Sequence, residues 1–140
     1  MTGEKISGER ERLIREAMGR VPYARLLGIE VGSIELGAAT LYMEAREELL
    51  QNRRVLHGGA TASLIDSASA FAILSLLEPG ENTTTVDLTV QYLRPVTEGR
   101  VTARAKVLRA GRRMITVSVE VTDASEKLVA TALTAYLRLT

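Results

Sequence analysis

Hydrophobic spacing predicts three elements at the start of the chain. Between residues 8 and 20, apolar side chains recur at helical spacing among glutamates and arginines, which predicts an amphipathic opening helix. The apolar positions of this helix are Leu13, Ile14, Ala17 and Met18. Residues 28–36 and 38–46 are typical of two strands, with Gly37 at the turn between them.

A long segment of small and apolar residues follows. It covers residues 55–80, with the sequence VLHGGATASLIDSASAFAILSLLEPG. The segment predicts a helix of about 20 residues that is stopped by Pro79 and Gly80. Asp66 is the one acidic or basic side chain between Arg54 and Glu78 that carries a full charge at neutral pH.

In the second half of the chain the apolar residues recur at every second position, which predicts four strands. The strand segments are residues 83–95, 100–109, 114–123 and 128–139. The first places Val86, Leu88, Val90 and Tyr92 on one face, and the last does so with Val129, Thr131, Leu133, Ala135 and Leu137. The junctions at 95–100, 109–113 and 123–127 are typical of hairpin loops.

These elements predict one α+β domain over residues 1–140. One helix that is apolar on nearly all sides, accompanied by about six strands, favours an antiparallel sheet wrapped around a long central helix, with the opening helix outside. Such a layer leaves strand edges and one sheet face uncovered, so we expect a homo-oligomer.

Composition excludes several classes of function. The chain has no cysteine and a single histidine, so we expect no metal site and no cysteine nucleophile. The net charge is +1 and the basic residues are scattered, which argues against nucleic-acid binding. The N-terminal segment is dense in charge, and the segment at 55–77 carries polar residues that are costly in a bilayer. We therefore expect a cytoplasmic protein that does not insert into membranes.

The lone carboxylate of Asp66 needs an explanation, because burying it without a partner costs several kcal/mol. Helical spacing places Ser63 and Ser69 on the same face of the predicted helix. One interpretation is structural: hydroxyl groups satisfy the carboxylate, or it simply faces solvent. The other interpretation is functional and begins with the HGG sequence at residues 57–59.

A helix that begins at HGG offers unpaired backbone N–H groups, and glycine allows another group to approach them closely. Such donors can form an oxyanion hole, and Asp66 can act as a general base or nucleophile. However, eight residues along one helix span about 12 Å. Gly58 and Asp66 can therefore cooperate only across a two-fold axis between antiparallel helices of two subunits, which predicts at least a dimer.

The sequence HGGATASLIDSASAFA resembles the motif of hotdog-fold acyl-CoA thioesterases. The resemblance is greatest to the group typified by the phenylacetate-pathway thioesterase and the mammalian thioesterase-superfamily hotdog proteins. It extends from about Tyr23 to the end of the chain and includes TVDLTVQYLRPV and AGRR. The resemblance implies a hotdog fold, hydrolysis of an acyl-CoA without a cofactor, and assembly as a dimer of dimers.

The resemblance also implies roles for individual residues. The Gly58 amide would polarise the thioester carbonyl, and Gly59 would lie beside it. Asp66 from the facing subunit would either activate a water molecule for attack on the carbonyl carbon or attack that carbon itself. Thr85 matches a hydroxyl position that helps hold the water or the acid. His57, which opens the helix, would cap or orient the turn. Direct proton transfer by His57 is the alternative role.

One feature departs from the family pattern N-x-x-G-x-x-H-G-G. Gln51 stands at the Asn position, Asn52 follows it, and Arg54 replaces the inner glycine. Either amide could orient the thioester or the water. In addition, Arg94, Arg112 and Arg113 could bind the phosphates of coenzyme A through charge-assisted hydrogen bonds, although exposed arginines also occur without any ligand.

The sequence therefore favours a thioesterase for small, medium-chain or aryl-acyl CoA substrates. A non-catalytic acyl-CoA-binding module of the same fold is the first alternative, and a hotdog dehydratase is the second. Release of free thiol distinguishes the thioesterase from the binding module and from the dehydratase.

Overall fold

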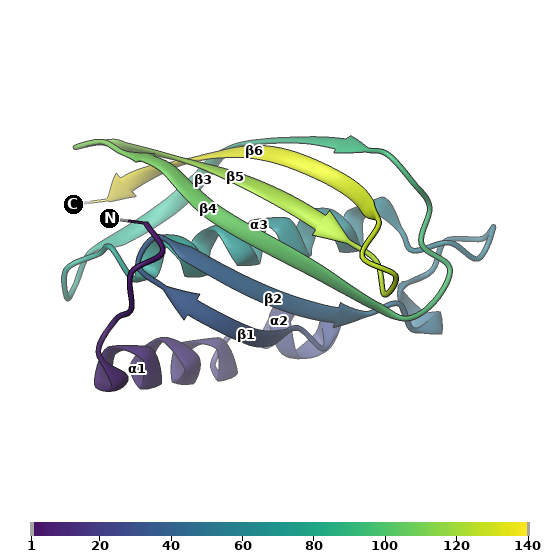
Figure 1. Cartoon of the computed structure of the whole chain (residues 1–140), viewed down its shortest axis with the longest axis horizontal. Coiled ribbons are helices and arrows are strands. Elements are labelled where there is room, and N and C mark those ends of the chain that lie inside the picture. Colours follow the sequence, from purple (N-terminus) through teal and green to yellow (C-terminus); the bar gives the residue numbers. More distant parts are fainter. Residues whose placement is uncertain (1, 140) are drawn as a thin grey trace.

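The computed structural model describes residues 2–139 as a curved six-stranded antiparallel sheet around one long helix (Figure 1). The helices are α1 (Gly8–Gly19), α2 (Pro22–Leu27) and α3 (Gly58–Leu74), with one 3-10 turn at Glu47–Leu49. The strands are β1 (Glu30–Glu35), β2 (Ala38–Glu44), β3 (Asn82–Tyr92), β4 (Arg100–Ala110), β5 (Met114–Thr122) and β6 (Leu128–Leu139). The α+β class, the opening helix and all six strands were predicted from the sequence, whereas α2 was not.

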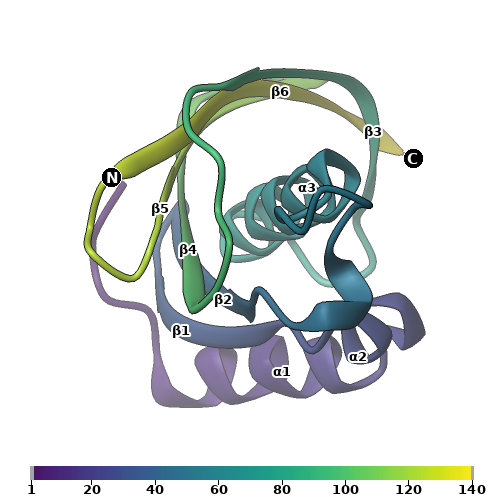
Figure 2. The same cartoon turned by 90° about the vertical axis from the view of Figure 1, so that its right-hand side faces the viewer.

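The strands lie in the order β1-β2-β4-β5-β6-β3, and every neighbouring pair is antiparallel. Seen along α3, the sheet curls around the helix, and α1 and α2 lie beside β1 on the outside (Figure 2). The concave face of the sheet packs on fully buried residues of α3, which include Leu64, Ile65 and Ala72. No helix within residues 2–139 is long and apolar enough to cross a membrane.

The central helix is shorter than predicted. It ends at Leu74, before Pro79 is reached, because its last turn is held by other parts of the chain. The Ser75 hydroxyl donates to the Ala72 carbonyl at 3.0 Å and accepts from the Gly37 amide at 2.7 Å. The guanidinium of Arg10 binds the carbonyl oxygens of Leu74 and Leu77. Tertiary contacts therefore end the helix earlier than the proline does.

The connection at residues 95–100 is not a hairpin, contrary to the prediction. β3 pairs only with β6, whereas β4 lies between β2 and β5, so the chain crosses from the sheet edge to its middle. The junctions at 109–113 and 123–127 do join neighbouring antiparallel strands, as predicted.

Alternation along β3 is interrupted by a bulge at Val86. Thr85 pairs with Tyr136 and Asp87 pairs with Ala135, so Val86 has no partner in the register. The bulge shifts the alternation by one residue. As a result Thr85 shares the helix-facing side of β3 with Leu88, although the two residues are three positions apart.

The predicted apolar face of β6 is not the face that packs on α3. The helix-facing side chains are those of Ala130, Ala132, Thr134 and Tyr136, all at most 8% exposed. Leu133 lies on the outer face and is 51% exposed. Two of the helix-facing side chains, Thr134 and Tyr136, donate hydrogen bonds to α3, which places this side of β6 towards the helix.

Candidate active site

The N-terminus of α3 leaves one backbone donor open. His57 is the N-cap, and its Nδ1 accepts from the Gly59 amide at 2.8 Å. The amides of Ala60 and Thr61 donate to the carbonyl oxygen of His57. Among the described residues, the Gly58 amide has no hydrogen-bond partner. A helix N-terminus carries partial positive charge, so this amide is placed to bind an oxygen that gains negative charge.

A hollow of about 320 Å³ lies over the Gly58 end of the helix. Its lining includes Leu56, Gly58, Tyr92 and Arg94. The Tyr92 hydroxyl donates to the Gly58 carbonyl oxygen at 2.6 Å, which fixes the ring beside the glycine. Partial burial raises the pKa of Tyr92 above its usual 10.0, so the phenol keeps the proton that it donates.

Asp66 lies two turns further along α3 and is held by hydroxyl groups of the sheet. Thr85 Oγ1 donates to Asp66 Oδ1 at 2.8 Å, and the Tyr136 hydroxyl donates to the same oxygen. The serines on the helix are engaged elsewhere. Ser63 donates to the Gly59 carbonyl oxygen, and Ser69 accepts from Thr134. Hydroxyls do bind the carboxylate, at Oδ1, but they come from β3 and β6 rather than from α3.

Tyr136 is a site residue that sequence reasoning missed. Burial raises its pKa far above the usual 10.0, and the hydrogen bond to Asp66 and the negative charge of Asp66 raise it further. Tyr136 therefore keeps its proton at neutral pH and donates it to Asp66. A signal was present in the sequence, because Tyr136 alternates with Ala132 and Thr134 on the side of β6 that is rich in small residues.

Within one chain the structure does not bring Gly58 and Asp66 together. Both residues belong to the 17-residue helix α3, eight positions apart. The helical rise separates them by about 12 Å.

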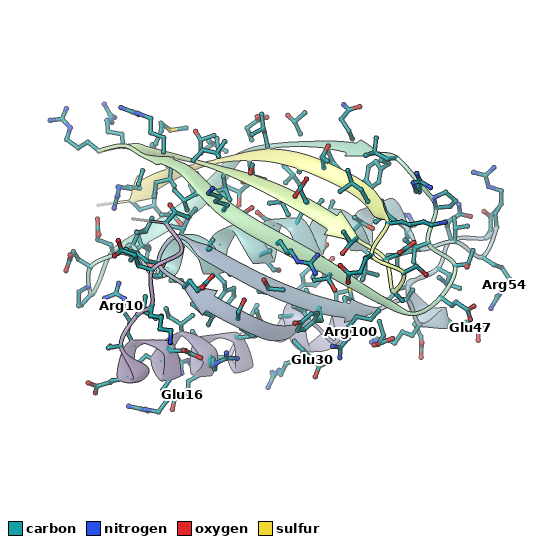
Figure 3. All side chains as sticks on the ribbon, viewed as in Figure 1. Arg10, Glu16, Glu30, Glu47, Arg54 and Arg100 are labelled. Carbon is teal, nitrogen blue, oxygen red and sulfur yellow. The ribbon has the colours of Figure 1, made fainter. Side chains whose placement is uncertain are left out.

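The two candidate amide residues lie in the loop that precedes α3. Gln51 accepts from the Arg53 amide through its side chain and is therefore used to hold the turn. Asn52 is exposed at that turn. Arg54 has a φ of 65°, the left-handed conformation that glycine adopts most easily. Arg54 thus keeps the backbone shape of the glycine that the family pattern has, and its side chain reaches Glu47 at 3.2 Å (Figure 3).

The candidate phosphate-binding arginines lie at opposite ends of the folded subunit. Arg94 lines the hollow at the start of α3. Arg112 and Arg113 line a second hollow, of about 800 Å³, together with Pro79 and Arg138. The hairpin between β4 and β5 that carries Arg112 and Arg113 is at the far end of the sheet from the start of α3 (Figure 1). One chain therefore does not assemble all three arginines.

An open amide and an anchored carboxylate are the groups that acyl transfer to water requires, namely a donor for the carbonyl oxygen and a base or nucleophile. The fold thus carries the two kinds of group that hydrolysis of an activated acyl group uses. Residues 54–130 match the thioesterase superfamily, which is more than half of the chain, and the chain belongs to this family. The protein is accordingly a thioester hydrolase with the hotdog fold, as the resemblance implied.

Individual relatives agree with this assignment. The chain is 30% identical to the medium/long-chain acyl-CoA thioesterase YigI of Salmonella typhimurium, covering 84% of this chain and 85% of that protein. It is 30% identical to the 1,4-dihydroxy-2-naphthoyl-CoA hydrolase of Listeria monocytogenes, covering 74% and 84%. The structure of the E. coli PaaI protein from the phenylacetic acid degradation operon superposes with a TM-score of 0.85 at 26% identity, covering 94% and 95%.

Proposed function

We propose that the protein hydrolyses an acyl-CoA thioester to the free acid and coenzyme A, at a site shared by two subunits. Gly58 of one subunit and Asp66 of the facing subunit form this site. The observation that carries the proposal is that α3 holds an unpaired amide at one position and an anchored carboxylate eight residues later. Neither group has a complementary reactive group beside it in its own chain.

The chemistry follows from these two groups. The thioester carbonyl oxygen accepts from the Gly58 amide, and the negative charge that develops during attack is stabilised there. Asp66 either removes a proton from the attacking water or attacks the carbonyl carbon itself. In both routes the C–S bond breaks, coenzyme A leaves as the thiol, and water supplies the oxygen of the free acid.

The free edge of the sheet supports the two-fold arrangement. β3 is 11 residues long, pairs on one side only, and exposes Val86, Leu88 and Tyr92. A long, apolar edge strand of this kind favours pairing with a second copy. The neighbouring side of α3 carries small, half-buried residues such as Ala62 and Ala70, which allow a second helix to approach. Further assembly into a dimer of dimers, and a cytoplasmic location, stay predictions.

The same two-fold arrangement gives the arginines a common role. Antiparallel pairing of two α3 helices brings the far end of one subunit towards the start of α3 in the other. Arg112 and Arg113 of one subunit would then approach Arg94 of its partner, where coenzyme A phosphates need cations. Asn52, or Gln51 through a change in the turn, would orient the thioester from the preceding loop, and Gly59 would allow close approach.

The acyl group is the least constrained part of the proposal. The two relatives act on an aromatic acyl-CoA and on medium or long acyl chains, as their names state. The substrate panel for this protein therefore has to include small, medium-chain and aryl-acyl CoA esters.

The first experiment measures release of free thiol from this panel by wild type, Asp66→Asn and Asp87→Asn. Asp87 is a matched control because it is also a carboxylate bonded to a threonine hydroxyl on β3. We expect turnover in wild type and Asp87→Asn, and a loss of about 1,000-fold or more in Asp66→Asn. Equal turnover in all three proteins contradicts the role of Asp66. Binding without thiol release indicates an acyl-CoA-binding module, and hydration of an enoyl-CoA without thiol release indicates a dehydratase.

A mixing experiment tests whether the site is shared. Gly58→Ala and Asp66→Asn are each expected to be inactive, but a mixed dimer has one site with both wild-type residues. Co-expression in equal amounts gives half mixed dimers with one intact site each, so about a quarter of wild-type turnover is expected to return. If each site were built from one chain, the mixture would stay inactive.

A further inference from the structure

The position of Tyr136 suggests that it acts on the reaction through Asp66. Tyr136 lies on the helix-facing side of β6 and is 2% exposed. Its hydroxyl donates to Asp66 Oδ1 and lies 2.8 Å from the carbonyl oxygen of Asp66. The β3 bulge aligns Thr85 with Tyr136 across the strand pair, so both hydroxyls reach the same carboxylate from the sheet.

The single phenolic proton of Tyr136 has two possible acceptors. The carbonyl oxygen of Asp66 lies inside α3 and already accepts the helical hydrogen bond of that turn. A carboxylate is the stronger acceptor because its hydrogen bonds are charge-assisted. The proton therefore belongs to the carboxylate, and the raised pKa of Tyr136 keeps that proton in place.

Both hydroxyl donors bind Oδ1, and this leaves the second oxygen of the carboxylate free. Asp66 Oδ2 has no hydrogen-bond partner among residues 2–139. Two donors on one oxygen also fix the rotation of the side chain, because either donor alone leaves the carboxylate able to turn. We propose that Tyr136 is a positioning residue, which together with Thr85 locks Oδ1 so that Oδ2 faces the reaction in the neighbouring subunit. This inference rests on the proposed function of Asp66.

The test compares Tyr136→Phe with Thr134→Val. Phenylalanine keeps the buried ring and removes the hydroxyl that contacts Asp66. Thr134 is a matched control, because it is on the same strand and side, is 1% exposed, and donates a hydroxyl to α3 at Ser69 rather than at Asp66. Both variants lose one buried hydrogen bond between β6 and α3, so both are expected to be less stable.

The two variants are expected to differ in catalysis. In Tyr136→Phe we expect kcat to fall about 10- to 100-fold, because a mobile carboxylate spends little time in the reactive orientation. KM should stay within about two-fold, since Tyr136 is buried and does not touch substrate. Thr134→Val should retain kcat within about three-fold. An equal fall in kcat in both variants, or an unchanged kcat in Tyr136→Phe, overturns the proposal.

A second substitution gives a readout that packing alone does not change. Thr85→Val removes the other hydroxyl that donates to Asp66 Oδ1. Because both donors hold the same oxygen, the losses of kcat in Tyr136→Phe and Thr85→Val should not add in the double variant, whereas those of Thr134→Val and Thr85→Val should add. Additive losses for Tyr136→Phe and Thr85→Val contradict the positioning role.

A measurement without substrate separates this inference from the proposed function. Crystal structures of wild type and Tyr136→Phe without ligand compare the orientation of the Asp66 carboxylate. We expect one orientation, with Oδ1 held by the two hydroxyls, in wild type and more than one in Tyr136→Phe. If wild type releases no thiol but this difference is present, the proposed function fails and the contact stands. If thiol release occurs and the carboxylate has the same single orientation in both proteins, the positioning role of Tyr136 fails.

Discussion

The two ends of α3 are treated in opposite ways by the rest of the chain. At the C-terminal end, the Arg10 guanidinium from α1 binds the carbonyl oxygens of Leu74 and Leu77, and the Ser75 hydroxyl binds that of Ala72. At the N-terminal end, the Gly59 amide donates to His57, and the Gly58 amide is left open under a hollow. The first end is closed by a cation, which a helix C-terminus favours.

The difference shows which end of the helix serves stability and which serves binding. Backbone groups that are left unpaired cost free energy unless water or a ligand satisfies them, so native chains close them wherever they can. Here the chain closes one end with three side-chain contacts and keeps a single donor open at the other. The open donor belongs to a glycine, so no side chain of its own residue blocks access to it. Changes at the N-terminal end should therefore affect turnover, and changes at the C-terminal end should affect the free energy of unfolding.

Among changes at the two ends of α3, the largest effect is expected from a methyl group at the open end. A Cβ on residue 58 would lie 3.3 Å from the Tyr92 ring, so Gly58→Ala can be accommodated by a small ring shift. The methyl group would nevertheless crowd the carbonyl that has to approach the amide. We expect thiol release to fall about 100-fold with little change in stability.

Gly8→Ala is the matched control for this substitution. Gly8 also is the first residue of a helix, after the N-cap Ser7, and a Cβ there meets nothing within 4 Å. We expect unchanged turnover in Gly8→Ala. A Gly58→Ala protein that turns over at the wild-type rate shows that the open amide is not used.

The next effect concerns the closed end. Arg10→Met removes the guanidinium that binds the Leu74 and Leu77 carbonyl oxygens and keeps much of the apolar side chain. We expect the free energy of unfolding in urea to fall by about 1–3 kcal/mol. The Nε of Arg10 is buried without a partner among the described residues, which reduces the net contribution of this side chain. Turnover at a temperature where the variant is folded should be unchanged.

Arg12→Met is the control for Arg10→Met. Figure 3 shows that the Arg10 side chain points from α1 towards the sheet. Arg12 is on the same helix, is well exposed, and pairs with Glu16 at 2.8 Å. A surface pair of this kind contributes about 0.5 kcal/mol or less. Equal losses of stability in the two variants would show that Arg10 does not close the helix.

A smaller effect distinguishes a cap from a base at His57. His57→Ala removes the acceptor for the Gly59 amide and should cost about 1 kcal/mol in the free energy of unfolding. His57→Asn restores a good N-cap but not an imidazole. We expect Asn to recover the stability and to retain thiol release within a few-fold. Loss of turnover in His57→Asn at wild-type stability would instead assign proton transfer to His57.

Much of this arrangement follows from local sequence. The spacing of apolar residues predicts the six strands and the opening helix, and HGG followed by Asp66 predicts the chemistry at the central helix. Thr85 was predicted to serve the acid or the water, and it contacts the acid directly. The strands and the HGG motif depend on residues that are close in sequence, whereas the role of Thr85 was implied by the family resemblance.

The features that were missed depend on long-range geometry. Alternation in β6 favours its more apolar side as the core side, but the buried side is the one that carries Thr134 and Tyr136, whose hydroxyls bind α3. Tyr136 was missed because these contacts join residues that are far apart in sequence. The bulge at Val86 and the crossover after β3 depend on which strands pair, which periodicity does not determine. The early end of α3 depends on Arg10, 64 residues before Leu74 in the sequence.

The smallest expected effect is at the ring that stands beside the open amide. Tyr92→Phe removes the hydrogen bond to the Gly58 carbonyl oxygen and should lower the free energy of unfolding by about 0.5 kcal/mol, because the side chain is more than half exposed.

The pKa of Tyr92 is raised in the folded protein, so well below pH 10.0 the phenol is neutral in both the folded and the unfolded states. The stability difference between wild type and Tyr92→Phe should therefore be constant from pH 7 to about pH 9. Above pH 10 the unfolded chain loses the proton first, so wild type should lose stability that the Phe variant keeps. Urea unfolding across this range measures the difference, and a gap that widens in favour of wild type above pH 10 would mean that the folded protein stabilises the ionised phenol.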